Sequence, residues 1–267
     1  MNYDYKLIKL EIADNIAVLT LNDPDALNTF SLNMLVELTE AMEIIEDPSN
    51  GVRCLVLTGA GRAFSAGANL NDPARKPLVT GKRDSGLFLE KWYMPIFLRI
   101  ADLGMPFITA VNGAAAGVGV SFALAGDMIL ASRSAYFLQA FRRIGLIPDG
   151  GATYVIPRLI GKVRAMELML LGERLPAEKA LEWGMINRVY DDEQLMPETM
   201  KLARDLAEGP TLSLGMMRKA CWQGLNNTYI EQIYLERKYQ RMMGVSEDHQ
   251  EGVTAFKEKR PPKFKGR

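Results

Sequence analysis

The chain has 267 residues, of which 48% are apolar, enough for one large domain or for one domain with an appended helical module. Lysine plus arginine equal aspartate plus glutamate at 32 each, so the overall charge gives no bias toward nucleic acid or acidic membranes. The two cysteines make no disulfide framework, and Cys54 is predicted to be a reduced core thiol. The N-terminus has no apolar signal-peptide core, which favours a cytoplasmic protein.

The first hundred residues predict strands alternating with helices. Short apolar runs predict buried strands, and a 3.6-residue period with Ser31 as N-cap predicts an amphipathic helix. The expected elements are strands at 7–12 and 16–21 with a turn at Asp14-Asn15, a polar loop at 22–28, a helix from Ser31 to about residue 45, a buried strand at 54–57, a loop at 58–70, a mobile polar segment at 71–85, and a helix at 86–103 kinked at Pro95.

The rest of the chain becomes mostly helical. The apolar stretch 110–131 is broken by Asn112 and Asp127, so it predicts a strand, a loop and a buried helix instead of a membrane span. We expect an α/β core at 1–199 and a C-terminal helical region at 200–267. The expected elements are strands at 107–111 and 128–131, a helix ending near residue 125, and helices at 165–171, 177–183, 196–207, 212–224 and 229–243.

Two loops of small residues, 63–68 and 113–119, each follow a predicted strand. Small side chains let a ligand approach backbone N–H groups, and such groups at Ala68 and Val118 can stabilise the charge on a carbonyl oxygen as it enolises. The alternative is that glycine and alanine only allow helices and sheet to pack closely. Either loop alone favours this packing interpretation.

Asp149 is the only carboxylate expected in the pocket that these loops would form. It lies in the turn Gly145-Leu146-Ile147-Pro148-Asp149-Gly150-Gly151, and the turn by itself would also explain these residues. Its position between the apolar runs 144–148 and 154–156 predicts a carboxyl group whose pKa is raised by desolvation. A proton shuttle near neutral pH requires such a pKa.

Several other chemistries are disfavoured. A dinucleotide fingerprint at Gly117-Val118-Gly119 fails because Phe122 takes the place of the third glycine. The only histidine, His249, lies in a polar segment and is expected to be solvated, which argues against a histidine triad or a histidine metal site.

The same motifs resemble the enoyl-CoA hydratase/isomerase, or crotonase, family nearly end to end. The matching stretches are Gly61-Arg62-Ala63-Phe64-Ser65-Ala66-Gly67-Ala68, Ala110-Val111-Asn112-Gly113, 144–151, and Glu251-Gly252 with Ala255-Phe256. The resemblance implies a spiral of ββα units, a C-terminal trimerisation region, trimers or dimers of trimers, and an acyl-CoA thioester substrate. It also places the two oxyanion N–H donors on Ala68 and Val118.

The acids suggest which reaction the chain performs. The resemblance places the two glutamates of true hydratases at Ser121 and Phe141, whereas Asp149 matches the single acid of several isomerases in the family. A closer resemblance, through 147–151, 235–241 and the tail 264–267, is to the ring-1,2-epoxyphenylacetyl-CoA isomerase type. Enzymes of this type also shift double bonds in enoyl-CoA chains.

We therefore predict an acyl-CoA isomerase that needs no metal or redox cofactor. A hydratase or thioester hydrolase of the same family, or a non-catalytic acyl-CoA-binding subunit, are the alternatives. The sequence does not identify the acyl group or decide between an aromatic and a fatty-acid pathway. It also does not decide whether the oligomer is a trimer or a hexamer. By resemblance, the residues that contact the substrate are Ala66, Gly67, Gly117, Ser121 and Phe141. Lys259 and Phe256 would contact the CoA. Trp92 and Tyr93 would line the acyl pocket, although packing in the helix core explains both of them better.

Overall fold

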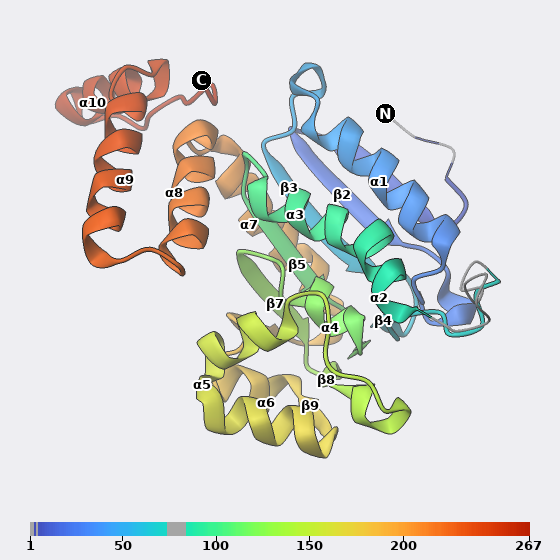
Figure 1. Cartoon of the computed structure of the whole chain (residues 1–267). Coiled ribbons are helices and arrows are strands. Elements are labelled where there is room, and N and C mark those ends of the chain that lie inside the picture. Colours follow the sequence, from blue (N-terminus) through green and yellow to red (C-terminus); the bar gives the residue numbers. More distant parts are fainter. Residues whose placement is uncertain (1–2, 4, 74–83) are drawn as a thin grey trace.

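The computed structural model describes residue 3, residues 5–73 and residues 84–267. The polar segment 71–85, predicted to be mobile, therefore lies largely outside the described residues. Figure 1 shows an α/β core from which the last helices extend to one side.

The larger sheet has six strands in the order β1-β2-β3-β5-β7-β10. β1 and β2 pair antiparallel around Asp14 and Asn15, which both have positive φ, and the other neighbours pair parallel. All the strands predicted from apolar runs are found here, with ends shifted by up to two residues. The strands are β1 (Ile8–Ala13), β2 (Ile16–Leu21), β3 (Cys54–Gly59), β5 (Phe107–Val111), β7 (Met128–Ser132) and β10 (Arg188–Tyr190).

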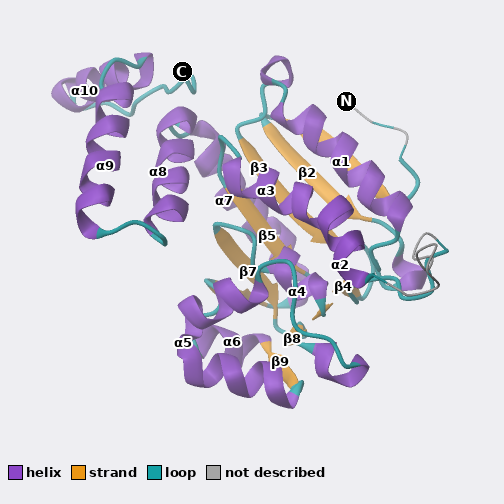
Figure 2. Ribbon diagram, viewed as in Figure 1, coloured by secondary structure: helices purple, strands orange, loops and turns teal. Residues whose placement is uncertain are grey.

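A second sheet of three-residue strands corrects the sequence assignment, which had placed 63–65 and 114–116 in loops. Its order is β4-β6-β8-β9, with β8 and β9 antiparallel. Three times, a strand of the larger sheet is followed by a short strand of this sheet and then by helix, which confirms the ββα spiral that the resemblance implies (Figure 2). The strands are β4 (Ala63–Ser65), β6 (Ala114–Ala116), β8 (Tyr136–Leu138) and β9 (Arg174–Pro176).

The helices follow most of the predicted pattern, but α5 begins at Ala152 instead of residue 165 and α10 was not predicted. Ser31 caps the first helix by accepting a hydrogen bond from the Met34 N–H, as expected. Before Pro95 the chain forms a π-helical turn over Leu89–Tyr93 instead of a simple proline kink. The helices are α1 (Leu32–Glu46), α2 (Ser85–Phe88), α3 (Met94–Asp102), α4 (Val118–Ala123), α5 (Ala152–Leu171), α6 (Ala177–Glu182), α7 (Leu195–Glu208), α8 (Thr211–Gly224), α9 (Tyr229–Met243) and α10 (Glu247–Glu258).

The larger sheet is buried on both faces. Leu55 and Leu57 of β3 join the main core, whereas Cys54 and Val56 point to the other face, where α7 packs. This explains the uninterrupted apolar strands. Burial raises the pKa of the Cys54 thiol to about 12, as expected for a core thiol. The predicted boundary at residue 200 falls inside α7, and the division into two domains stays a prediction.

A buried ion pair fastens α8 to the core. The Arg218 guanidinium lies 2.7 Å from the Asp127 carboxylate at the start of β7 and also donates to the carbonyl oxygens of Ala101 and Leu103. Asp127 in turn accepts from the Phe107 N–H at 2.8 Å. The start of the helical extension is thereby tied to α3, β5 and β7.

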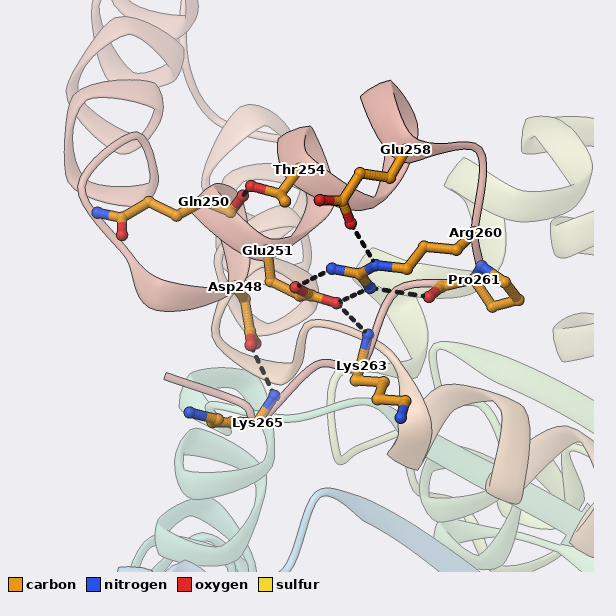
Figure 3. Close-up of polar contacts among 9 residues, drawn as sticks. All are labelled: Asp248, Gln250, Glu251, Thr254, Glu258, Arg260, Pro261, Lys263 and Lys265. Carbon is orange, nitrogen blue, oxygen red and sulfur yellow. Dashed lines mark hydrogen bonds and ion pairs between the residues drawn. The ribbon is translucent and has the colours of Figure 1, made fainter.

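The polar segment around His249 and the basic tail form ordered structure. The segment is the first turn of α10, capped by Ser246, although His249 itself is exposed as expected. The tail folds back onto α10 (Figure 3). The Glu251 carboxylate accepts from Arg260 at 2.6 and 2.9 Å and from the Lys263 N–H at 2.8 Å, while buried Asp248 accepts from the N–H groups of Lys265 and Gly266.

The attachment of the tail predicts a pH dependence. The hydrogen bonds that Glu251 accepts from Arg260 and the Lys263 N–H lower the pKa of the Glu251 carboxyl group to about 2. The ionised carboxylate therefore stabilises the attached tail fully above the usual carboxyl pKa, and this stabilisation is lost as pH falls toward 2. At neutral pH, Glu251→Gln should accelerate amide hydrogen exchange in residues 260–267. The control Glu258→Gln removes a single contact to Arg260 and should have a smaller effect. Equal exchange in both variants would contradict this role of Glu251.

Candidate active site

Two strands of the small sheet bring the small-residue loops together. β4 and β6 pair parallel, with Ala63 opposite Ala114 and Ser65 opposite Ala115. The carboxyl ends of parallel strands lie at one edge of a sheet, so the segments after Ser65 and Ala116 start side by side. The structure thus brings together the two loops that the sequence singled out.

The backbones of these loops touch where glycine allows it. A Cβ added to Gly67 would lie 2.6 Å from the Ala116 carbonyl oxygen and 3.6 Å from the Gly117 Cα. One added to Gly119 would lie 2.5 Å from the Ser65 carbonyl oxygen. The packing role considered for these residues is therefore correct. It is compatible with ligand binding, because the same close approach brings backbone N–H groups of both loops into one region.

Two N–H groups of these loops stand out because the N–H groups of Gly67, Asn69 and Gly117 beside them are paired. On the first loop, the Gly67 N–H donates to Ser65 Oγ and the Asn69 N–H to the Phe30 carbonyl oxygen. On the second, the Gly117 N–H donates to the Leu138 carbonyl oxygen. Within the described part of the chain, the N–H groups of Ala68 and Val118 donate no hydrogen bond. Val118 as a whole is 2% exposed, and its side chain packs in the main core.

Asn28 holds the first loop in place, a role that sequence reasoning missed by treating 22–28 only as a polar loop. Its fully buried side chain donates to the carbonyl oxygens of Ala60 and Ala63, and its own carbonyl oxygen accepts from Ser65 Oγ at 2.7 Å. The Ala66 N–H donates to Leu27. The only sequence signal was an asparagine in a turn, a residue type that tolerates the positive φ found here.

Asp149 is hydrogen-bonded through its main chain to α4, the helix that begins at Val118. Its main-chain carbonyl accepts from the Ser121 hydroxyl at 2.8 Å and from the Ala152 N–H at 3.1 Å, and its Oδ1 is buried. The expected apolar surroundings are only partly present, because Ile144, Leu146 and Ile147 are 50%, 46% and 79% exposed. Oδ1 of Asp149 is nevertheless buried, so the expectation of a desolvated carboxyl group stays a prediction.

Ser121 and Phe141, the positions of the hydratase glutamates by resemblance, are both buried. The Phe141 ring lies beside Gly117, 3.9 Å from where a Cβ of that glycine would be. Ser121 is engaged with Asp149. Neither side chain is an acid at this place.

A cavity of ≈ 630 Å³ opens beside Ser121, Gly150 and Gly151. Its volume is in the range of small-molecule sites. Its walls come from the helical stretch before residue 102, from α4, α5 and α8, and are mainly apolar and aromatic; they include Leu89, Tyr93, Phe97, Leu98, Tyr154 and Trp222. Glu90 also borders it and is exposed. The loops 63–68 and 113–119 contribute none of its lining residues, so the expectation that Asp149 is the only carboxylate in the pocket of those loops stays a prediction.

The other predicted contact residues divide between core, cavity and a distant surface. Tyr93 borders the cavity but is 1% exposed and packs on Phe30, while Trp92 packs against the main core, as the packing alternative predicted. Lys259 ends α10, which lies apart from α4 in Figure 1, and Phe256 of the same helix is 85% exposed. Within one chain the structure does not bring Lys259 or Phe256 to Ala68 and Val118.

No cluster of three or more metal-ligating side chains occurs among residue 3, residues 5–73 and residues 84–267. In the same residues, none of the helices combines the length and the apolar character needed to cross a membrane.

The comparisons with known proteins agree with this geometry. A family model described as enoyl-CoA hydratase/isomerase matches residues 11–267. The chain is 47% identical to 1,2-epoxyphenylacetyl-CoA isomerase of Escherichia coli over 98% of this chain and 99% of that protein. It is 40% identical to a probable enoyl-CoA hydratase of Rhodobacter capsulatus, again over 98% and 99%. A crystal structure of a putative enoyl-CoA hydratase from Streptomyces coelicolor superposes with a TM-score of 0.90, at 31% identity over 99% of this chain and 96% of that one.

The spiral of ββα units and its paired loops define a protein of the crotonase fold. The chain belongs to the enoyl-CoA hydratase/isomerase family.

The contact between the loops predicts a difference between two glycine substitutions. Gly67 and Gly145 have φ of +95° and +68°, but a Cβ at Gly145 meets nothing within 4 Å. Both Gly67→Ala and Gly145→Ala carry a backbone cost of about 1–2 kcal/mol for an L-residue at positive φ. Gly67→Ala adds an overpacking cost of about 1–3 kcal/mol. Urea unfolding should therefore show Gly67→Ala as the less stable variant. Equal unfolding free energies would mean that the loops separate without cost.

Proposed function

We propose that the protein is an acyl-CoA isomerase that moves a double bond next to a CoA thioester. The N–H groups of Ala68 and Val118 polarise the thioester carbonyl and stabilise the enolate oxygen. Asp149 removes the proton from the α carbon and returns it to the γ carbon. The reaction as proposed needs no metal or redox cofactor.

The pair of N–H groups on adjacent loops is the observation that carries this proposal. Each is a donor that has no hydrogen-bond partner among the described residues, while the N–H groups of Gly67, Asn69 and Gly117 beside them are paired. Such preorganised donors act where charge develops, and losing one typically costs about 3 kcal/mol in the transition state. Their usual substrate in this family is the oxygen of an acyl thioester, which is why an acyl-CoA is proposed.

Three features favour isomerisation over hydration. Ser121 and Phe141 stand where the resemblance places the hydratase acids, and the Ser121 hydroxyl is directed to a main-chain carbonyl. Asp149 remains beside α4 as a single acid. The relatives include, besides the Escherichia coli enzyme, a trans-2-decenoyl-[acyl-carrier-protein] isomerase of Streptococcus mutans at 32% identity.

Hydratase or thioester hydrolase activity is the second candidate, favoured by Glu90 at the cavity rim and by relatives named as probable enoyl-CoA hydratases. Glu90 would supply an acid that Ser121 and Phe141 cannot. A binding subunit without activity is the third candidate, and replacement of Asp149 would leave it unaffected.

The first test is incubation with 3-hexenoyl-CoA in deuterated water, followed by mass and NMR analysis. We expect 2-hexenoyl-CoA to form, and Asp149→Asn to lower kcat by about 10²–10⁴-fold because the proton carrier is lost. Binding of the CoA ester should persist. Glu90→Gln is the matched control and should retain isomerisation.

Two results would overturn the isomerase proposal. Accumulation of a 3-hydroxyacyl product or of free CoA would identify a hydratase or hydrolase. Full activity of Asp149→Asn would assign the proton transfer to another group.

The acyl group that we propose is aromatic-derived. The support is the aromatic wall formed by Phe97, Tyr154 and Trp222, together with the name of the Escherichia coli relative. On a ring epoxide, Asp149 could assist rearrangement to an oxepin, which would place the protein in phenylacetate degradation in the cytoplasm. The alternative acyl group is a linear enoyl chain of fatty-acid degradation, because most of the cavity wall is apolar.

We also propose a homotrimer or a dimer of trimers. Apolar side chains are exposed on two helices that lie apart in Figure 1. Two different surfaces that bind each other close into a ring when the rotation allows it. The exposed residues are Leu159, Val163, Met166 and Leu170 on α5 and Tyr229, Ile230, Ile233 and Tyr234 on α9.

This proposal predicts a mass of three or six chains by size exclusion with light scattering. Val163 and Ile230 are 81% and 62% exposed, so aspartate at either position should leave the fold of one chain intact. Each variant should nevertheless shift the mass toward a single chain, because a charge is then buried in the interface. A wild-type protein that is monomeric at micromolar concentration would contradict the proposal.

A further inference from the structure

The main chain beside Asp149 is held from two sides. Gly150 has a φ of +58°, and a Cβ added to it would lie 2.8 Å from the Phe97 ring and 2.8 Å from Ser121 Cβ. The turn therefore runs through a gap that only a glycine fits. A movement of Gly150 toward either side has to displace the ring or the serine.

The serine adds a directed contact to this packing. Ser121 is 5% exposed, and its hydroxyl donates to the Asp149 carbonyl oxygen at 2.8 Å. Ser121 lies three residues after Val118 on the same short helix, about one turn away. The helix that presents one proposed donor thus also fixes the main chain of the proposed acid.

Three aromatic rings continue the connection to the other donor. The Phe97 ring lies 4.5 Å from that of Phe122 on α4, and Phe122 stacks on Phe30 at 4.3 Å. The Phe30 main chain is hydrogen-bonded on both sides of Ala68, accepting from the Asn69 N–H and donating to the Gly67 carbonyl. The column Phe97–Phe122–Phe30 therefore runs from the Asp149 turn to the Ala68 loop.

We infer that Ser121 and Phe97 are positioning residues that fix the Asp149 carboxylate relative to the two oxyanion donors. This inference rests on the proposed function. It assigns Ser121 a task other than contact with substrate: at the place where the resemblance puts a hydratase acid, this chain uses a hydroxyl to anchor the acid that it has. Phe97 provides the opposing surface and at the same time a wall of the cavity.

The test compares Ser121→Ala and Ser121→Cys with the wild-type protein on 3-hexenoyl-CoA. Misplacement of a reacting group by about 1 Å can lower the rate about 10²-fold. We expect kcat of Ser121→Ala to fall at least about tenfold with KM nearly unchanged. Cysteine keeps the shape and a weak S–H donor, so Ser121→Cys should recover part of the loss.

Isotope incorporation separates positioning from a general loss of structure. When the acid is misplaced, the abstracted proton stays longer on the carboxylate and exchanges with solvent before it reaches the γ carbon. The product made in deuterated water by Ser121→Ala should then contain more deuterium per turnover than the wild-type product. A purely structural role would lower the amount of active protein without changing this ratio.

Phe97→Leu is tested against Phe107→Leu, a substitution of an equally large core ring at the start of β5 that lies outside the column. Both should lower Tm, whereas only Phe97→Leu should lower kcat and raise deuterium incorporation. The same loss of kcat in both variants would overturn the role of Phe97.

Unchanged kcat and isotope ratio in Ser121→Ala would overturn the role of Ser121. If Asp149→Asn is inactive in that case, the proposed function stands and only this inference fails. If Asp149→Asn keeps full activity, the proposed function itself fails.

Discussion

The pairing of two three-residue strands, β4 and β6, is the constraint on which the site depends. Their parallel alignment starts the two loops side by side, and Gly67 then allows the first loop to contact the main chain at Ala116 and Gly117. Any larger residue at this contact would separate the N–H groups of Ala68 and Val118. The chemistry proposed for the site therefore depends on backbone geometry, and the small side chains matter because they let the two loops approach closely.

The longer elements could be predicted because their patterns are strong. Strands such as 54–57 and 107–111 are wholly apolar because both faces of the larger sheet are covered, and Ser31 marked the start of α1. Strands of three residues, in contrast, carry no period that can be distinguished from a loop, so β4 and β6 were missed. α10 was missed because its first turn, Glu247 to Glu251, is charged, and charges at a helix N-terminus resemble a polar loop in sequence.

The candidate site divides in the same way. Ala68, Val118 and Asp149 could be named because they stand in turns of unusual composition, and their placement on adjoining elements follows from the fold. Asn28, Phe97 and Glu90 could not, because each lies outside those turns and reaches the site only through tertiary packing. The exposure of Ile144 and Ile147 shows the converse limit, since an apolar run beside an acid does not establish that it covers the acid.

The anchors around Asp149 hold its main chain: the Ser121 hydroxyl and the Ala152 N–H both donate to its carbonyl oxygen, and Phe97 packs on the glycine that follows. None of these contacts depends on which side chain residue 149 carries. A mutation at 149 can therefore change the chemistry without releasing the turn, while the turn itself is inherited unchanged. The main chain of this turn can therefore present different reactive groups at position 149 in the same place beside α4.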